Sequence, residues 1–174
     1  MDVIKINIEN NIKNIENELL KDIEKTKHLR DYSFSVETKF KDKLYGIFLK
    51  ICEKKLNKFT LKNNNFNLHA YYTDKYWCKG GRIIENDNLS FNRFHNHIKT
   101  STINSVLYLK SPKGCGLDIE YDNKVKFIEA DSYDFLIFPN WLNHRPVISN
   151  KESRISLNLE LSCNENVNDI FNPL

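Results

Sequence analysis

Cysteine, histidine and long apolar runs are scarce in this sequence. The four cysteines are widely scattered and form no CxxC pair, which argues against a cysteine-ligated zinc cluster and against a small disulfide scaffold. Reduced thiols are therefore expected. No stretch approaches the roughly 18 apolar residues of a membrane span, and the polar N-terminus lacks the apolar core of a signal peptide. These absences predict a cytoplasmic protein with no membrane partner.

An excess of charge of one sign is also absent. The net charge is only +3, and lysines are interleaved with acids along the chain. A basic block with interleaved aromatic residues, which would follow a phosphate backbone, does not occur, so no nucleic acid partner is expected. With 174 residues the chain is long enough to bury a core, and we expect a single domain over residues 1–174.

The N-terminal third predicts two amphipathic helices, over about residues 8–27 and 40–56. Apolar residues recur there at spacings of three and four, with charged residues between them. We expect these stripes to pack against a core and not to bind a ligand. The first stripe contains Ile8, Ile12, Ile15, Leu19 and Ile23, and the second contains Leu44, Ile47, Phe48 and Ile51.

The rest of the chain is typical of β structure. Aromatic and β-branched residues become dense, and turn signals such as NDN, SPKG and YDNK recur at short intervals. The runs that predict strands are NLHAYYT, RIIEN, INSVLYLK, GLDIEYDN, FLIFPN and RISLNLELS. Short strands after two helices predict a mainly β, α+β protein, with an antiparallel sandwich or barrel over residues 66–162 and helical support from residues 1–60.

Two of the five histidines lie one residue apart in FHNHI, residues 94–98. Alternate residues of a strand project to the same side, so His95 and His97 would lie about 6.5 to 7 Å apart at their Cα atoms, a spacing suited to one metal ion. A lone H-x-H is a weak signal. The alternative is a pair of half-exposed polar residues at the rim of a strand.

A third histidine, His144, lies in FPNWLNHRP, between a predicted strand and a proline that holds the chain extended. Three histidines from two strand edges can meet. Imidazole suits iron, zinc, copper or nickel, and three protein ligands on one face leave positions open for substrate and oxygen. The alternative for His144 alone is a hydrogen-bonded polar residue beside Trp141.

Two later strands carry residues suited to binding a carboxylate. Arg154 and Ser156 share the polar face of RISLNLEL, where an arginine is well placed to make two parallel hydrogen bonds to a carboxylate. Tyr108 of INSVLYLK would add a phenolic donor. The alternatives are a rim salt bridge between Arg154 and Glu152, and an ordinary strand residue at Tyr108.

The order and spacing of these motifs resemble those of a known enzyme family. The similar set is W…GG…HNH…INSVLYL…SPKGCGLDIEYDN…YDFLIFPNWLNHRP…SRISLNLEL, which covers Trp77 to Leu161. It resembles the 2-oxoglutarate- and Fe(II)-dependent oxygenases of the H-x-H type, bacterial and phage relatives of the prolyl 4-hydroxylase-like enzymes. The resemblance implies a double-stranded β-helix, that is, a cupin-like jelly roll, in the cytoplasm of a bacterium or a virus-infected host cell.

The resemblance also implies an activity and a set of site residues. The implied enzyme is a dioxygenase that uses O2, couples 2-oxoglutarate decarboxylation to C–H oxidation and hydroxylates an unknown substrate, either a peptide side chain or a small molecule. Carried over residue by residue, the Fe(II) positions match His95, His97 and His144, and the positions that bind the distal carboxylate of 2-oxoglutarate match Arg154, Ser156 and Tyr108.

One position departs from the wider superfamily, whose second metal ligand is usually an aspartate or a glutamate. His97 occupies that place and removes one negative charge, so Asp118 or Glu120 of GLDIEY are alternative anionic ligands. Strand alternation favours His97. Two other functions stay open: a cupin-like three-histidine metalloenzyme that needs no 2-oxoglutarate, with Arg154 holding the substrate, and a non-catalytic jelly-roll binding module.

Overall fold

The computed structural model describes residues 3–26, 33–34, 38–56, 65–73, 93–147, 154–163 and 166–171. The predicted strand RIIEN and Cys78 lie outside these residues, whereas Cys52, Cys115 and Cys163 are thiols and not disulfides. The elements are β1 (Ile4–Asn7), α1 (Glu9–Thr26), β2 (Ser33–Phe34), α2 (Thr38–Lys55), β3 (Asn65–Thr73), β4 (Ile103–Lys110), β5 (Gly116–Tyr121), β6 (Lys124–Glu129), β7 (Asp134–Pro139), β8 (Asn143–Val147), β9 (Arg154–Ser162) and α5 (Val167–Phe171).

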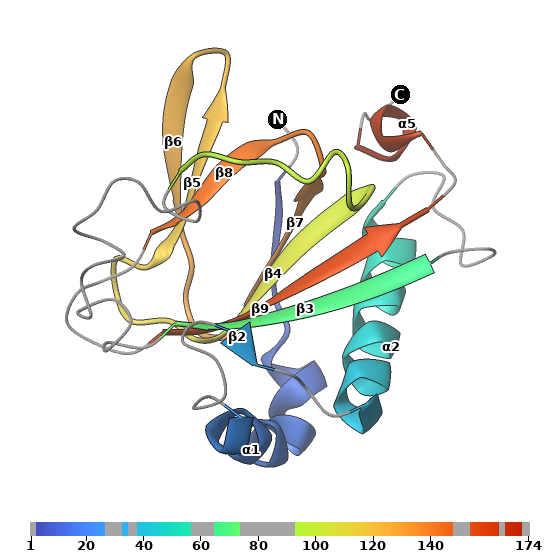
Figure 1. The fold of residues 1–174 in the computed structure, drawn as a ribbon, viewed down its shortest axis with the longest axis vertical. Helices are drawn as coiled ribbons and strands as arrows, with labels where there is room; N and C mark the ends of the chain where they lie inside the picture. Colours follow the sequence, from blue (N-terminus) through green and yellow to red (C-terminus); the bar gives the residue numbers. More distant parts are fainter. Residues whose placement is uncertain are drawn as a thin grey trace.

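The strands form two antiparallel sheets (Figure 1). The larger sheet has six strands in the order β1-β7-β4-β9-β3-β2, and the smaller has three in the order β6-β5-β8. Strands distant in the sequence pair along their whole length, as β3 does with β9. An inner apolar cluster that includes Tyr108, Ile119 and Phe138 joins the two sheets. The predicted mainly β, jelly-roll fold is confirmed, although the sheets do not close into a barrel in the described part of the chain.

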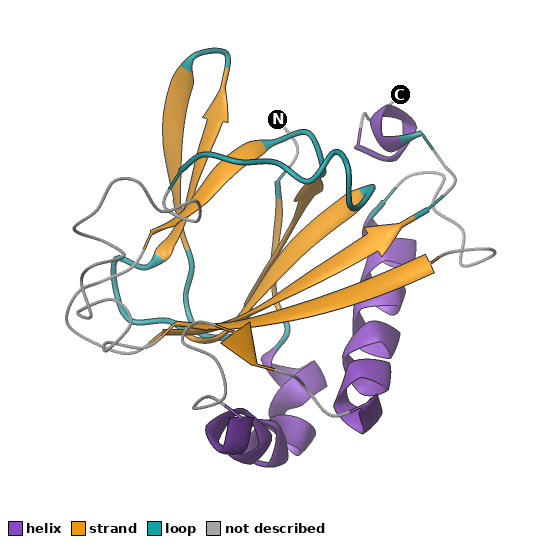
Figure 2. Cartoon of the chain, viewed as in Figure 1, coloured by secondary structure: helices purple, strands orange, loops and turns teal. Residues whose placement is uncertain are grey.

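Helices α1 and α2 cover the outer face of the six-stranded sheet (Figure 2). Ile12 and Leu19 of α1 and Phe48 of α2 are buried in one cluster with the outward-facing residues of the sheet, among them Leu107 and Phe135. The predicted packing of the apolar stripes is therefore confirmed, and each helix begins and ends within two residues of its predicted bounds. None of the described helices combines the length and apolar character needed to cross a membrane.

Phe48 provides a test of this packing. Its ring meets that of Phe135 edge to face at 5.5 Å, and the Phe48 side chain is fully buried. Replacing Phe48 with alanine is expected to lower the free energy of unfolding by about 3–5 kcal/mol, because the change leaves a cavity between helix and sheet. Urea denaturation followed by circular dichroism would measure the loss. Lys50→Ala, at an exposed position of the same helix, is the matched control and should change stability by less than about 0.5 kcal/mol.

Strands β1, β2, β6 and β8 and helix α5 were not predicted. β1 and β8 are short, and five of the six residues of β6 are exposed, so none of them contains an apolar run of the kind that marks a strand. Pairing with β7 and with β5 defines them instead. The C-terminal segment NENVNDIFNPL is mostly polar, with one weakly apolar patch. It forms α5, whose Ile170 and Phe171 are buried against the helix-covered core.

Candidate metal centre

The candidate site lies on the inner face of the six-stranded sheet. Strand β9 alternates polar and apolar residues, and its apolar residues, such as Leu157 and Leu159, pack toward the helices. The polar and charged residues therefore point into the space between the sheets, where all of them are buried. These inward residues are Arg154, Ser156, Asn158 and Glu160 of β9, with Tyr108 and Asn104 of β4 paired opposite Ser156 and Glu160.

His95 and His97 do not lie on a continuous strand. His95 forms one isolated antiparallel bridge with His144 of β8, through backbone hydrogen bonds of 3.0 and 2.9 Å. The backbone N–H of His97 donates to the carbonyl of Asn140 at 2.8 Å, and a turn follows. The strand expected for FHNHI is thus reduced to a single bridge. Residues 93–102, here called the crossing segment, lie beside β8 of the smaller sheet at His95 and then enter β4 of the larger sheet.

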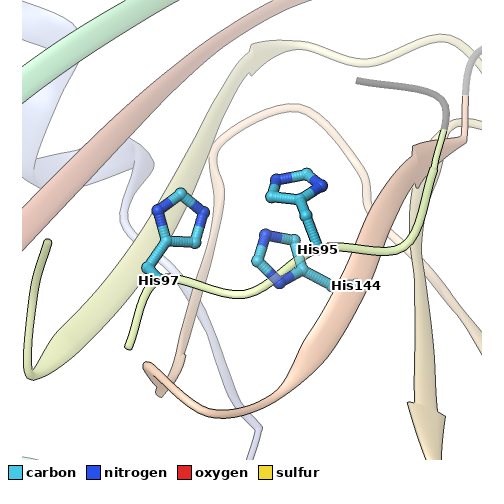
Figure 3. Close-up of side chains that lie close together, drawn as sticks. All are labelled: His95, His97 and His144. Carbon is cyan, nitrogen blue, oxygen red and sulfur yellow. The ribbon is translucent and has the colours of Figure 1, made fainter. Parts of the chain in front are cut away.

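The crossing segment nevertheless brings the three histidines together. The ring centroids of His95, His97 and His144 lie 4.5 to 5.3 Å apart in every pair. One ring nitrogen of each lies within 4.8 Å of the others, close to the spacing that a single ion requires. Figure 3 shows His95 and His97 leaving the crossing segment on the same side, with His144 coming from β8. The three histidines form a group that can hold a metal ion.

Backbone carbonyls fix the orientation of two of the imidazoles. His95 Nδ1 lies 3.1 Å from the carbonyl of Arg93, and His144 Nδ1 lies 2.9 Å from that of Leu142. A proton on Nδ1 leaves the Nε2 lone pair for a metal. Burial lowers the pKa of His95, and burial lowers the pKa of His144 to about 3. Both rings are therefore neutral near neutral pH, which is the form that coordinates a metal ion.

A carboxylate holds the third imidazole. His97 Nδ1 lies 2.8 Å from Oε1 of Glu160, so its N–H donates to the carboxylate. Nε2 of the same ring is buried and has no hydrogen-bond partner within the described part of the chain. A buried nitrogen without a partner is costly unless something binds it. A metal ion shared with His95 and His144 would satisfy this atom, so the residues present fit a bound metal.

The structure does not bring the alternative acidic residues into this cluster. Both Nε and Nη2 of Arg145 donate to Oδ2 of Asp118 at 3.0 Å. Oε2 of Glu120 accepts a hydrogen bond of 3.3 Å from Asn143. Among the described residues the candidate metal group contains only histidines. The carboxylate that does reach it, Glu160, was missed by the sequence analysis, although it continues the alternation of Arg154, Ser156 and Asn158 on β9.

Arg154 is buried beside Tyr108. The arginine is 4% exposed, and its guanidinium donates to the carbonyl of Val147 and to Oγ of Ser156, each at 3.1 Å. Its Cζ atom lies 5.4 Å from the centre of the Tyr108 ring. Such burial does not match the alternative considered for Arg154, a salt bridge with Glu152 at the rim of the sheet. Glu152 itself lies outside the described residues. The structure thus brings together the three residues assigned from the sequence to a carboxylate site.

The hydroxyl of Tyr108 is a second buried polar atom without a partner in the described structure. Burial raises the pKa of Tyr108 to about 12, with Arg154 acting in the opposite direction, so the phenol keeps its proton and remains a donor. A buried phenolic donor next to a buried guanidinium is suited to binding a carboxylate. The distal carboxylate of a dicarboxylate such as 2-oxoglutarate is of this kind, so the residues present fit a ligand of that class.

Comparison with solved structures shows a similarity of fold. The solved structure of a viral collagen prolyl hydroxylase from Paramecium Bursaria Chlorella virus-1, in its 2OG complex, superposes with a TM-score of 0.51 and 16% sequence identity, over 95% of this chain and 97% of that one. The chain has the fold of this prolyl hydroxylase. No protein-family model matches the chain, and neither does any curated protein sequence.

The prolyl hydroxylase fold agrees with the resemblance drawn from the motifs. The architecture implied by those motifs is the one observed, and the cluster of three histidines fits an oxygenase of the H-x-H type. At this level of identity the similarity establishes the fold. The activity of a site on such a fold depends on the residues of that site.

Proposed function

We propose that this protein is a 2-oxoglutarate- and Fe(II)-dependent dioxygenase that hydroxylates a peptide side chain or a small molecule. The observation that carries the proposal is the pairing of two sites in one inter-sheet space. A cluster of three imidazoles lies beside β8, and a buried arginine with an unpartnered tyrosine hydroxyl lies on β9 and β4. A bound metal would explain the imidazole cluster, and a bound dicarboxylate would explain the buried arginine and tyrosine.

Each residue has a role in this proposal. His95, His97 and His144 would hold Fe(II) through Nε2, since the Nδ1 atom of each ring is already engaged. Bound Fe(II) supplies the redox chemistry by which O2 oxidises a C–H bond of the substrate to a hydroxyl while 2-oxoglutarate is converted to succinate and CO2. The residues that would bind the distal carboxylate of 2-oxoglutarate are Arg154, Ser156 and Tyr108.

The protein environment contributes orientation and exclusion of water. Arg154 and Ser156 are hydrogen-bonded to each other, so their donors are held in place before a carboxylate arrives. Both are almost fully buried, and charge-assisted hydrogen bonds are stronger in such a site than in water. The distal carboxylate would therefore anchor 2-oxoglutarate and aim its keto-acid end at the histidine cluster.

The test is succinate production. Purified protein with Fe(II), 2-oxoglutarate and O2 is expected to release succinate slowly without a substrate and faster with one. Proline-containing peptides are the first substrates to try, since the similar structure is that of a collagen prolyl hydroxylase. Removing the metal with a chelator should stop succinate release, and added Fe(II) should restore it. Mass spectrometry would detect a substrate mass gain of one oxygen atom.

A second function is favoured by one observation, namely that the described metal group contains no carboxylate. A cupin-like three-histidine metalloenzyme would use the same cluster without 2-oxoglutarate, and Arg154 would then grip the substrate itself. Metal binding without succinate release would support this alternative. Failure to bind any metal would leave the non-catalytic binding module.

A further inference from the structure

The three histidines differ in the hydrogen-bond partner of Nδ1, the ring nitrogen that would face away from the metal. His95 and His144 each meet a neutral backbone carbonyl at this position, and His97 meets the carboxylate of Glu160. The carboxylate comes from β9 of the six-stranded sheet, 63 positions along the chain from His97 (160 − 97 = 63). Within the described part of the chain, His97 is therefore the one imidazole of the cluster with a charged partner.

Glu160 is held firmly in this position. Its side chain is 4% exposed. Its Oε1 atom accepts hydrogen bonds from Nδ1 of His97 at 2.8 Å and from Nδ2 of Asn158 at 3.2 Å. Two donors on one oxygen fix the direction of the carboxylate. Burial of a carboxylate is costly unless positive charge or hydrogen bonds compensate it. A divalent ion bound on the far side of the His97 ring would supply positive charge at this place.

We propose that Glu160 is the anionic group of the metal centre and acts through His97 as a positioning residue. The inference rests on the metal-binding part of the proposed function. A carboxylate that accepts the N–H of a metal-binding imidazole fixes the ring and increases the basicity of the coordinating nitrogen. Glu160 thereby provides the negative charge that the three-histidine ligand set lacks. In this protein the carboxylate lies one imidazole further from the metal than it does in an H-x-D site.

The experiment separates charge from orientation. Glu160→Gln keeps an oxygen that can accept the His97 N–H but removes the charge, Glu160→Asp keeps the charge on a shorter side chain, and Glu160→Ala removes both. Metal affinity is measured by anaerobic calorimetry with Fe(II) alone. We expect about 10- to 100-fold weaker binding for Glu160→Gln, a smaller loss for Glu160→Asp and the largest loss for Glu160→Ala.

Glu129→Gln is the matched control. It makes the same change of charge on an exposed acid of β6 that accepts the backbone N–H of Gly114 and lies outside the histidine cluster. Its metal affinity is expected to stay within about twofold of that of the wild type. Circular dichroism on every variant establishes that the fold is retained.

A second measurement needs neither metal nor substitution. Nitrogen NMR of the metal-free wild type, labelled at histidine, reports which ring nitrogen carries the proton. His97 is expected to carry it on Nδ1, held by Glu160, and Glu160→Ala should shift this signal while leaving those of His95 and His144 unchanged. A proton on Nε2 of His97 in the wild type would overturn the inference even if Glu160→Gln failed to fold.

The outcomes distinguish this inference from the proposed function. Equal metal affinity in Glu160→Gln, Glu129→Gln and the wild type would overturn the role of Glu160 and leave the oxygenase proposal standing. Weakened binding in Glu160→Gln, together with no succinate from the wild type, would support the role and overturn the oxygenase. A wild type that binds no metal would overturn both.

Discussion

Replacing His97 with alanine is expected to abolish Fe(II) binding while the fold is retained. His97 belongs to the crossing segment between the two sheets and to neither apolar core cluster, so its loss removes a ligand without opening a cavity in the core. It also leaves Glu160 without its 2.8 Å imidazole partner, which should cost about 1–3 kcal/mol of stability. Anaerobic Fe(II) titration in the presence of 2-oxoglutarate, followed by the charge-transfer absorption of the bound complex, would measure the loss.

The alternative ligand assignment makes the opposite prediction. If Asp118 or Glu120 were the anionic ligand, His97→Ala would keep the metal, and Asp118→Ala or Glu120→Ala would lose it. An intact absorption band in His97→Ala would refute our assignment. The structure favours the three histidines, because the carboxylate of Asp118 is engaged by Arg145 and that of Glu120 by Asn143.

The variant His97→Asp is expected to be milder, with partial iron binding and some succinate release. An aspartate restores the carboxylate ligand of the wider superfamily, but its side chain is shorter and would lie near the carboxylate of Glu160. Like charges at close range disfavour each other. The double variant with Glu160→Gln removes that repulsion and should bind Fe(II) more tightly than His97→Asp alone. A double variant that binds no better would contradict the proximity of the two charges.

Replacing Arg154 with alanine is expected to raise the apparent KM for 2-oxoglutarate about tenfold or more. The guanidinium is the buried cation of the site, and a charge-assisted hydrogen bond contributes roughly 1.5 to 3 kcal/mol. Fe(II) binding without 2-oxoglutarate should be retained, since Arg154 is not part of the histidine cluster. Succinate release at varied 2-oxoglutarate concentrations gives the KM, and metal titration of the same variant gives the control.

Two further variants sharpen this test. Arg154→Lys keeps the charge but loses the planar pair of donors, so its KM should fall between those of the wild type and Arg154→Ala. Tyr108→Phe removes only the hydroxyl, which has no partner in the described structure, so it should raise the KM while leaving stability unchanged or slightly increased. Normal 2-oxoglutarate turnover in Arg154→Ala would place the carboxylate site elsewhere. The other candidate cations for a carboxylate site are Lys99, Lys110 and Arg145, of which Arg145 is paired with Asp118.

Local periodicity in the sequence determined much of the fold. The strands β4 and β9 have the bounds predicted from INSVLYLK and RISLNLELS, because residues that face the helices alternate with residues that face the other sheet in both. Helices α1 and α2 follow from apolar spacings of three and four residues in the same way. The same alternation placed Arg154 and Ser156 on one face of β9 and Tyr108 on the inward face of β4, where the structure has them.

Contacts between distant residues decided the rest. The strand β1 forms because it pairs with β7, and β6 and β8 form because they pair with β5. The sequence of a short segment does not reveal such pairing. His95 and His97 converge with His144 through a single bridge and a crossing segment, where strand alternation had been expected. Glu160 looked like one more charged residue near the end of a strand. Only the tertiary structure turns it into the partner of His97, because a hydrogen bond between sheet and crossing segment depends on how the chain is folded and leaves no periodic pattern in the sequence.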